Sequence, residues 1–414
     1  MKERYVIRLG IGFATGRKNF KRVLEVYLRN WNFVKDKIRD EEISLNLFVA
    51  YDTCYQNTQS TEFTNLSQNI VDSFDKVIFI GQKNVSLSFK LLIEKSGLDE
   101  RDVKTLFSSG YAGKRNSVLF SAIANHMDYL LFLDDDEYPM AVTNNHDVAL
   151  WSGQPVFYSH LKEISKADFT TGYHCGYVSP IPQIDFDKTL SETDFKLFIE
   201  TISNDIINWD HIRDLMRTQG VTYADTDVLI QKKAKEVPLI HGCRFISGAN
   251  LCINLTNAQK TLPFFNPPGA RGEDTFLSTL LEDRRVLQVP VYAFHDGFGY
   301  YKEILSGALP IELAPIDMTN KVVEKRFLSA CIGWIRYKPL YILLTDPEHS
   351  EERMDAVNDA LTQVLPKMAA KFNNNQFLSI KDEFNIYRKR APKHCRMFES
   401  SQKSWNDLMK IFID

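Results

Sequence analysis

The chain has 414 residues, of which 44% are hydrophobic and 25% charged, and its formal net charge is -3. A chain of this length can bury a large core and suggests one large domain with an appendage, or two modest domains. The small net charge excludes a global attraction to nucleic acid or to an acidic polymer, so an anionic ligand must be met locally.

The first third of the chain alternates strand and helix patterns, which is typical of an α/β domain with a largely parallel sheet. Residues 5–12 predict a first strand, and residues 12–16 predict the turn after it. A helix follows, because apolar residues from 20 to 31 recur on one face. Residues 44–51 and 76–80 predict the next two strands.

Four acids follow the next predicted strand. The pattern predicts a helix over residues 116–127 and a strand over 129–133, which places Asp134 and its neighbours at the carboxyl end of a strand. Open parallel sheets bind ligands along that edge. The segment from about residue 141 to residue 238 predicts a mixed sheet with loops, including a strand at 167–178.

The remainder of the chain predicts a short return to strands and then helices. Residues 244–254 predict a strand with a Ser-Gly-Ala break, residues 273–281 a helix, and residues 286–294 a strand. Beyond about residue 316 the apolar residues follow a helical period. We therefore expect an α/β domain over residues 1–315 and a helical region over residues 316–414.

The acids in the stretch YLLFLDDDEYPM need a positive partner. Adjacent carboxylates repel one another, and at the mouth of an apolar strand a divalent cation is the simplest compensation. In an extended segment Asp134 and Asp136 point to one side and Asp135 to the other. Mg²⁺ and Mn²⁺ prefer oxygen ligands and keep positions open for phosphates. The alternative is a solvated acidic turn.

A second candidate lies upstream, in the stretch GYAGKRN at residues 110–116. It predicts a glycine-containing loop that opens a helix and carries Lys114 and Arg115. Helix starts and arginine forks both suit phosphate oxygens. A solvated loop would use the same residues.

Together these pieces, GYAGKRNSVLFSAIANHMDYLLFLDDDE, resemble the nucleotide-sugar glycosyltransferases of the GT-A fold, most closely glycosyltransferase family 2. In those proteins a similar glycine-x-x-arginine-asparagine helix precedes an apolar strand that ends in a D-x-D motif. The resemblance implies a Rossmann-like fold that binds a nucleoside-diphosphate sugar, with residues 1–140 as the nucleotide-binding half and 141–315 as the acceptor and catalytic half.

The resemblance also implies roles for individual residues. Asp134 would approach the ribose or the metal, Asp136 would ligate the metal through the diphosphate, and Arg115 would neighbour the nucleotide. Thr15 or Arg17 would lie against the nucleotide, although GIGFATGRKN replaces the family's more usual proline-threonine-tyrosine stretch.

Three further positions belong to the expected donor site. Asp52 looks like the family's acidic residue that accepts a hydrogen bond from the base, and a simple turn or cap aspartate is the alternative. Asp135 would touch the ribose or the donor sugar. Gly248 would lie near the donor sugar, where a small residue lets the backbone approach closely; a plain bulge glycine is the alternative.

The stretch RGEDTFLS resembles the E-D motif of inverting family 2 enzymes, in which the aspartate is the base. Asp274 is therefore the expected base with Glu273 in support, and a helix N-terminal cap is the alternative. His295 would be a further metal ligand beside Asp136 or a structural histidine. Because such a histidine also occurs in retaining GT-A enzymes, stereochemistry stays open, with inversion favoured.

These inferences predict a glycosyltransferase that depends on Mn²⁺ or Mg²⁺ and moves a sugar from a UDP- or GDP-linked donor to a saccharide or other hydroxyl acceptor. A retaining GT-A enzyme, a sugar-phosphate nucleotidyltransferase and an inactive sugar- or nucleotide-binding protein are the alternatives.

Composition also bears on location. The six cysteines are scattered without a C-x-x-C pair, which argues against a zinc ribbon or a disulfide framework. The first ten residues lack the apolar core of a signal peptide, and no apolar run approaches the roughly 18 residues that span a bilayer. We expect a cytoplasmic protein without a transmembrane segment. The basic stretch at 387–396 is a solvated patch or faces an anionic acceptor or a membrane surface.

Overall fold

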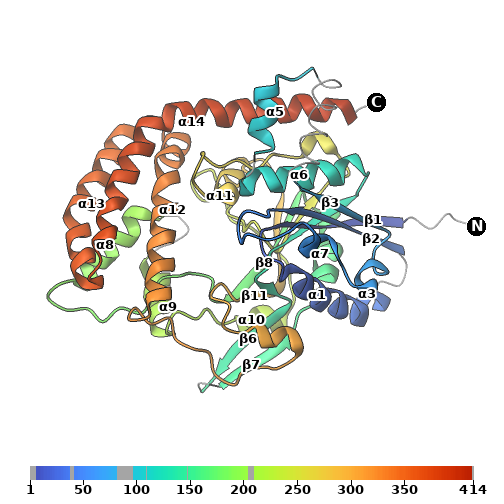
Figure 1. Ribbon diagram of the computed structural model, residues 1–414, viewed down its shortest axis with the longest axis horizontal. Coiled ribbons are helices and arrows are strands. Elements are labelled where there is room, and N and C mark those ends of the chain that lie inside the picture. The colour runs from blue at the N-terminus through green and yellow to red at the C-terminus, as the bar shows by residue number, and fades with distance from the viewer. Residues whose placement is uncertain are drawn as a thin grey trace, which may run out of the picture.

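The computed structural model describes residues 6–37, 42–81, 97–108, 110–146, 148–203 and 209–412. An α/β core carries a layer of long helices along one side, and β1 (Val6–Thr15) begins at the opposite end of the molecule from this layer (Figure 1).

Nine described strands form one sheet in the order β3-β2-β1-β4-β10-β8-β11-β5, with β9 paired to β11 off this path. Their bounds are β1 (Val6–Thr15), β2 (Glu42–Tyr51), β3 (Lys76–Ile80), β4 (Tyr129–Leu133), β5 (Glu137–Tyr138), β8 (Phe169–Gly176), β9 (Lys235–Glu236), β10 (Leu251–Asn254) and β11 (Val286–His295). The strands β1 to β4 pair in parallel, whereas β10 is antiparallel to both neighbours. The expected mixed α/β sheet is confirmed. A separate hairpin consists of β6 (Met140–Asn145) and β7 (Val148–Gly153).

The central strand β4 is covered on both faces of the sheet, which explains why its sequence is apolar throughout. Leu131 and Leu133 pack in the core on one face of the sheet, with α1 (Phe20–Val34) and α7 (Val156–Ile164). Leu130 and Phe132 pack on the other face, with α6 (Tyr111–Ala124). Successive side chains of a strand point to opposite faces, so a strand covered on both faces needs apolar residues at every position.

Two predicted boundaries are wrong. The turn expected at residues 12–16 does not begin there, because β1 continues to Thr15. Gly12 lies within the strand, and a Cβ atom there would lie 2.8 Å from Val118 Cγ1, so glycine lets α6 pack closely. The loop expected over 110–116 is helical from Tyr111 onwards. Gly113 permits this because a Cβ atom there would overlap the backbone of Ser108.

Other predictions agree with the structure. The strands at 76–80 and 129–133 are confirmed at both ends, and the helix from residue 20 is α1. By contrast, the strand expected over 244–254 forms only over β10, because residues 245–250 are irregular.

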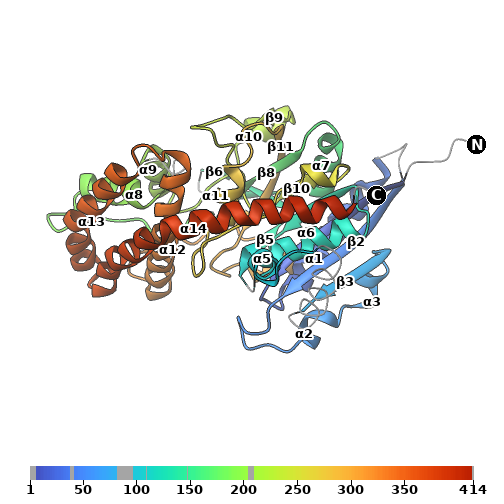
Figure 2. The same ribbon diagram turned by 90° about the horizontal axis from the view of Figure 1, so that it is seen from above.

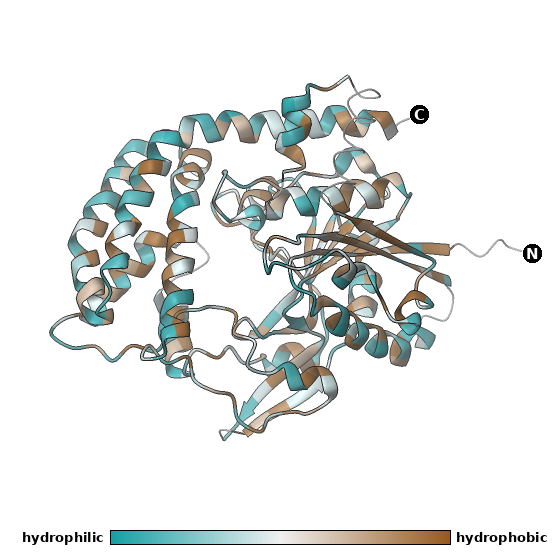
Figure 3. Ribbon diagram, viewed as in Figure 1, coloured by the Kyte–Doolittle hydropathy of each residue, from teal (hydrophilic) through white to brown (hydrophobic). Residues whose placement is uncertain are grey.

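The helical region expected beyond residue 316 is confirmed and consists of α12 (Lys321–Thr345), α13 (Ser350–Phe372) and α14 (Ser379–Met409). Two helices from earlier in the chain, α8 (Glu192–Ile202) and α9 (Trp209–Arg217), share its core. Figure 3 shows the sheet strands brown over most of their length, whereas the long helices alternate teal and brown. The helical layer thus includes elements from both predicted regions.

The last helix joins the two parts of the molecule. Figure 2 shows α14 running lengthwise from the helical layer to α5 (Glu100–Leu106) and α6. Near its end, Trp405 is fully buried in the core on the α6 face, and its Nε1 donates to Thr261 Oγ1 at 3.1 Å. In the basic stretch at 387–396, Arg388 turns toward α13 and pairs with Glu351 and Asp355 at 2.6 and 2.7 Å.

The remaining described helices are short: α2 (Thr61–Thr64), α3 (Gln68–Val71), α10 (Thr226–Gln231), α11 (Glu273–Ser278) and the 3-10 turns η1 (Lys35–Lys37), η2 (Ala258–Lys260), η3 (Lys302–Ser306), η4 (Asn375–Leu378) and η5 (Lys410–Phe412). None of the helices in the described ranges combines the length and apolarity that crossing a bilayer requires.

Candidate functional site

The candidate residues gather where the strand order of the sheet reverses. β1 lies between β2 and β4, although β4 follows both in the chain. Loops diverge at such a switch point and leave a crevice outside the carboxyl ends of the strands. Thr15 ends β1 and Asp134 follows β4, so both face this crevice region.

The acids follow β4 in a turn, not in an extended segment. The strict alternation that would pair Asp134 with Asp136 therefore does not apply. Asp135 and Asp136 both pair with Arg17, whereas Asp134 pairs with Arg115. The acid turn is thus divided between two arginines.

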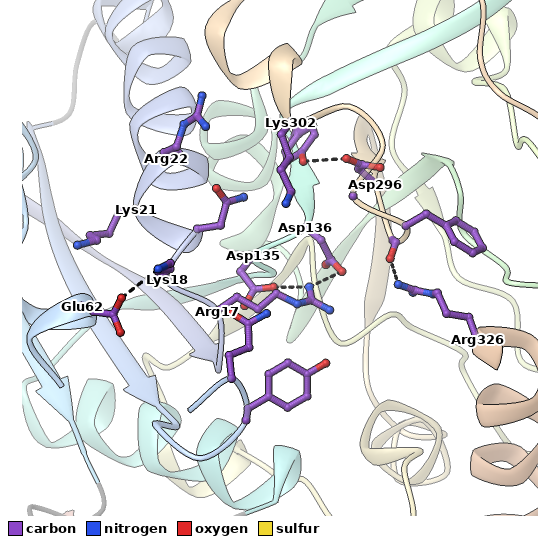
Figure 4. Close-up of a pocket in the computed structure, with 17 residues that line it drawn as sticks. Arg17, Lys18, Lys21, Arg22, Glu62, Asp135, Asp136, Asp296, Lys302 and Arg326 are labelled. Atoms are coloured by element: carbon purple, nitrogen blue, oxygen red, sulfur yellow. Dashed lines mark hydrogen bonds and ion pairs between the residues drawn. The ribbon is translucent and has the colours of Figure 1, made fainter. Parts of the chain in front are cut away.

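Arg17 bridges two of the acids. Its Nη1 lies 2.6 Å from Asp135 Oδ1 and 2.6 Å from Asp136 Oδ2 (Figure 4). The hydroxyl of Thr15 donates to the other oxygen of Asp135, and the Arg17 backbone N–H donates to that hydroxyl at 3.0 Å. Burial opposes the charge of Arg17, but Asp136 and Asp135 raise its pKa. This cluster holds a cationic group between two carboxylates.

His295, at the end of β11, faces the same acids. Its Nδ1 lies 2.6 Å from the carbonyl oxygen of Tyr177, so Nδ1–H donates there and Nε2 points toward Asp136 Oδ2 at 3.7 Å. Burial opposes protonation, but the charge of Asp136 raises the pKa of His295 to about 9. Burial likewise opposes ionisation of Asp136, yet His295 and Arg17 hold its pKa below the ordinary value.

The donor atoms of this cluster fit a hard divalent cation, although within the described ranges no three His, Cys, Asp or Glu side chains are gathered as a metal site. Asp135 and Asp136 offer carboxylate oxygens, and His295 would offer Nε2 once it loses the proton that its raised pKa favours. The carbonyl that orients His295 is the kind of outer partner that metal-binding imidazoles use. Arg17 supplies the positive charge between the carboxylates, so a bound cation would have to displace its guanidinium.

Arg115 organises the other side of the acid turn. It is 2% exposed, and its Nη2 and Nε lie 3.0 Å from Asp134 Oδ1 and 3.6 Å from Glu273 Oε1. Its Nη1 donates to the carbonyl oxygen of Gly248. A Cβ atom at Gly248 would lie 3.0 Å from Arg115 Nη2, so the close approach of the arginine accounts for this glycine.

Electrostatics in this second cluster favour partly protonated acids. Burial raises the pKa of Asp134 to about 7, against the charge of Arg115 and together with the neighbouring carboxylates. Burial opposes the charge of Arg115 itself, but Asp134 and Glu273 raise its pKa. The guanidinium carbon also lies 5.3 and 5.7 Å from the centroids of two phenylalanine rings, a favourable cation–π arrangement.

Asp274 lies in the first turn of α11, beside this cluster. Gly272 occupies the cap position of α11 without a side-chain cap bond, and Glu273 and Asp274 are the acidic residues of the first turn, as the helix-start alternative also expects. Asp274 Oδ1 accepts from the Thr275 backbone N–H at 2.9 Å. Burial, and next the charge of Glu273, raise the pKa of Asp274 to about 6. A carboxylate with a near-neutral pKa suits proton transfer at neutral pH.

The loop that leads to Asp274 is held by the helical layer. Arg336 of α12 donates from Nη1 to the carbonyl oxygen of Gly269 at 2.9 Å, and Tyr387 of α14 donates from its hydroxyl to the carbonyl oxygen of Pro268 at 2.7 Å. Arg336 also forms a two-pronged pair with Glu383, with both N–O distances 2.8 Å. Arg336 of α12 therefore binds both α14, through Glu383, and the loop, through Gly269.

Gly272, immediately before α11, has a φ of 97°, a conformation that favours glycine. A Cβ atom there would lie 2.9 Å from the ring of Tyr337 on α12. The backbone turn into Glu273 and Asp274 is thus shaped both by glycine and by the packing of α12.

Asp52 and Lys114 form a third group. Asp52 Oδ2 lies 2.8 Å from Lys114 Nζ, and Asp52 Oδ1 accepts from the Cys54 backbone N–H at 2.8 Å. Burial opposes ionisation, but the bond from Lys114 lowers the pKa of Asp52. Lys114 also lies 5.6 Å from the ring centroid of Tyr111. Asp52 is therefore an ionised acceptor that also fastens the turn after β2.

A pocket of about 790 Å³ opens beside the acid turn. The start of α1, the turn after β11 and Arg326 of α12 line it together with Asp135 and Asp136 (Figure 4). Its volume is typical of small-molecule sites. Lys302 also lines it. Sequence reasoning missed Lys302 and Arg326, since no local pattern shows that they line the same pocket as Asp135 and Asp136.

Asp296 is another residue whose role the sequence did not indicate, although it directly follows His295. It is 1% exposed and accepts from the Tyr138 hydroxyl at 3.2 Å and from the backbone N–H groups of Tyr300 and Tyr301 at 2.9 Å each. Its own backbone N–H donates to the carbonyl oxygen of Asp136 at 2.8 Å. Asp296 thus ties the turn after β11 to the acid turn.

The expected site residues fall into three groups in the structure. The first contains Thr15, Arg17, Asp135, Asp136 and His295, the second contains Arg115, Asp134, Gly248, Glu273 and Asp274, and the third contains Asp52 and Lys114.

A scan against protein-family models finds no match for this chain, and a search of curated proteins finds none with significant similarity.

Proposed function

We propose that the protein is a metal-dependent glycosyltransferase that moves a sugar from a nucleoside-diphosphate sugar to an acceptor hydroxyl. One observation carries the proposal: an acid turn at a sheet switch point adjoins a cluster that contains a half-buried carboxylate with a pKa of about 6, Asp274. Such a site combines a place for a cation with a proton acceptor. The GT-A resemblance of residues 110–137 supports the same class.

We assign a Mg²⁺ or Mn²⁺ ion to Asp136 and His295, with Asp135 as the further carboxylate of the same cluster, because the expected ligand Asp134 pairs with Arg115 instead. When bound, such an ion neutralises charge on a departing diphosphate. Movement of Arg17 away from Asp136 would make its guanidinium available to phosphate oxygens, which arginine binds through paired hydrogen bonds.

The protein's own groups then divide the remaining tasks. Asp52 accepts a hydrogen bond from the nucleobase of a UDP- or GDP-linked donor, beside Lys114. Arg115 lies between Asp134 and Glu273, offsets the repulsion between their charges and fixes their positions. Asp274 takes the proton of the acceptor hydroxyl, which corresponds to inversion at the transferred carbon.

The test is a panel of UDP- and GDP-sugars with Mn²⁺, read by thermal shift and by slow hydrolysis of the donor. Asp136→Ala should abolish the metal-dependent shift. Asp274→Asn should keep the shift and lower transfer by about 10²- to 10⁴-fold, the usual contribution of a general base. Asp283→Asn, an exposed acid shortly after α11, is the matched control and should behave like the wild type.

The alternatives have distinct outcomes. Release of pyrophosphate from a nucleoside triphosphate would replace the proposal with a nucleotidyltransferase. Binding of a nucleotide sugar without hydrolysis or transfer would indicate an inactive binding protein. A product that retains the donor's anomeric configuration, or full activity of Asp274→Asn, would remove Asp274 as the base.

A further inference from the structure

The pocket beside the acid turn has a strongly basic wall. Six cationic and four acidic side chains line it. The cations come from three separate parts of the chain: the start of α1, η3 and α12. Figure 4 shows Arg17 beside Asp135 and Asp136, with Lys302 above and Arg326 to the right, whereas the side chains of Lys21 and Arg22 point away from the two acids. The chain as a whole has a net charge of -3, so this concentration of positive charge is local.

Two of these cations are balanced by acids of the pocket. Arg17 pairs with Asp135 and Asp136, and Lys18 pairs with Glu62 at 3.1 Å. Arg17 and Lys18 therefore do not contribute to the excess positive charge of the pocket.

The other four cations form no ion pair with a carboxylate in the part of the chain that the structure describes. Lys21 Nζ donates to the Asn65 carbonyl oxygen at 2.9 Å, and Arg22 Nη2 donates to Ser306 Oγ at 2.8 Å. Arg326 donates to the carbonyl oxygen of Gly297 and lies over the ring of Phe298, 4.7 Å from its centroid. The fourth is Lys302, which is exposed at the pocket rim.

The donor's diphosphate does not account for this excess. A diphosphate diester carries one charge per phosphate, and the divalent cation proposed at Asp136 balances it. Because the ion and the diphosphate cancel, the pocket keeps its surplus of cations over acids, six against four, whether or not Arg17 moves.

We infer that this basic wall binds a second anionic group, a phosphate carried by the acceptor. Phosphate fits the wall because its several oxygens can accept from donors that approach from different directions, and lysines and arginines from three elements do so here. The assignment of the phosphate to the acceptor rests on the proposed transferase function, whereas the anion site itself does not.

The position of the wall agrees with an acceptor role. Asp274 and Arg115 do not line this pocket, so the pocket continues away from the proposed base, on the other side of the acid turn. An acceptor that spans both places would present its hydroxyl to Asp274 and its phosphate to the cations. The substrate class is thus a phosphorylated saccharide or another phosphorylated alcohol.

The first experiment measures binding of inorganic phosphate by calorimetry, without metal and without nucleotide. The double variant Arg22→Gln with Lys302→Gln should bind phosphate at least about tenfold more weakly, because each lost cation removes a charge-assisted hydrogen bond. Arg29→Gln with Lys325→Gln is the control of equal charge. Both control residues are exposed, on α1 and α12, and neither lines the pocket. It should bind phosphate as the wild type does.

The second arm identifies the source of the phosphate. Affinity for UDP with Mn²⁺ should stay the same in the double variant, while transfer to phosphorylated acceptors should show a raised KM and an unchanged kcat. An equal loss of affinity for UDP with Mn²⁺ would show that the wall serves the donor's diphosphate and would overturn the inference. Absence of saturable phosphate binding in the wild type, or equal weakening in the control, would also overturn it.

Failure of the transferase proposal has a different signature. If no nucleotide binds with Mn²⁺ while Arg22 and Lys302 still determine phosphate affinity, the anion site is established and its assignment to an acceptor is rejected.

Discussion

Two arginines divide the acid turn and differ in how firmly they are held. The side chain of Arg115 is 3% exposed, whereas that of Arg17 is 27% exposed. Arg115 is enclosed by the acids and aromatic rings around it, so its removal would leave buried charges without a partner. Arg17 lies at the pocket, where solvent lowers the cost of moving its guanidinium. Because of this difference, a bound cation can displace Arg17, whereas Arg115 keeps its position beside Asp134.

Asp274 should give transfer an acidic limb in its pH profile. Because only the carboxylate can accept a proton, kcat/KM should fall as the pH drops through about 6, the raised pKa of this residue. Glu273→Gln removes the neighbouring charge that helps to raise this pKa, so the limb should move to lower pH. The measurement is initial rate against pH at constant Mn²⁺. An unchanged limb in Glu273→Gln would contradict the assignment.

At the scale of elements, two helices outside the sheet fasten the loop that carries the proposed base. Arg336 and Tyr387 donate to the carbonyl groups of Gly269 and Pro268, five and six residues before Asp274. The short helix α11 makes no side-chain cap bond at its start, and these contacts instead fix the loop that leads into it. Helices α12 and α14 thus position a residue that they do not contain.

Arg336→Ala should therefore lower kcat while leaving the affinity for UDP with Mn²⁺ unchanged. The loss is expected to be about tenfold, the equivalent of one hydrogen bond between a charged group and the loop. Tyr387→Phe removes only the hydroxyl bond and should have a smaller effect. Arg353→Ala, in a pair with Asp346 on the far part of the helical layer, is the control. Equal losses in kcat and nucleotide affinity would show general damage to the site.

At the scale of the whole molecule, α14 makes the helical layer and the α/β core mechanically continuous. Its first part packs with α12 and α13, and its end inserts Trp405 into the core on the α6 face. Helix α12, which carries Arg326 into the pocket, belongs to the same layer. Pocket, base loop and sheet are thus parts of one folded unit.

Trp405→Ala should destabilise both parts together. Truncation of a fully buried tryptophan costs about 3–5 kcal/mol, and the loss should appear as one shifted unfolding transition. Denaturant unfolding followed by circular dichroism for the helices and by tyrosine fluorescence would measure it. Trp405→Phe keeps most of the apolar contact and should lose less. Separate transitions for the two signals in Trp405→Ala would contradict the single unit.

The sequence by itself determined the local elements and the placement of the acids. The apolar run of β4 predicted a strand, and its end predicted the acids at the carboxyl edge. The helical period beyond residue 316 predicted α12 to α14. These features depend on side-chain periodicity within a few turns or residues, which is readable without knowledge of contacts.

Only the tertiary structure decided which groups meet. Because the chain turns after β4, Asp135 and Asp136 both form ion pairs with Arg17. In an extended segment Asp134 and Asp136 would have pointed to the same side. Arg326 and Lys302 entered the pocket from segments remote in sequence, and α8 and α9 joined the helical layer. Local periodicity cannot predict such long-range contacts, because they arise from packing between distant elements and from the charge balance that burial then requires.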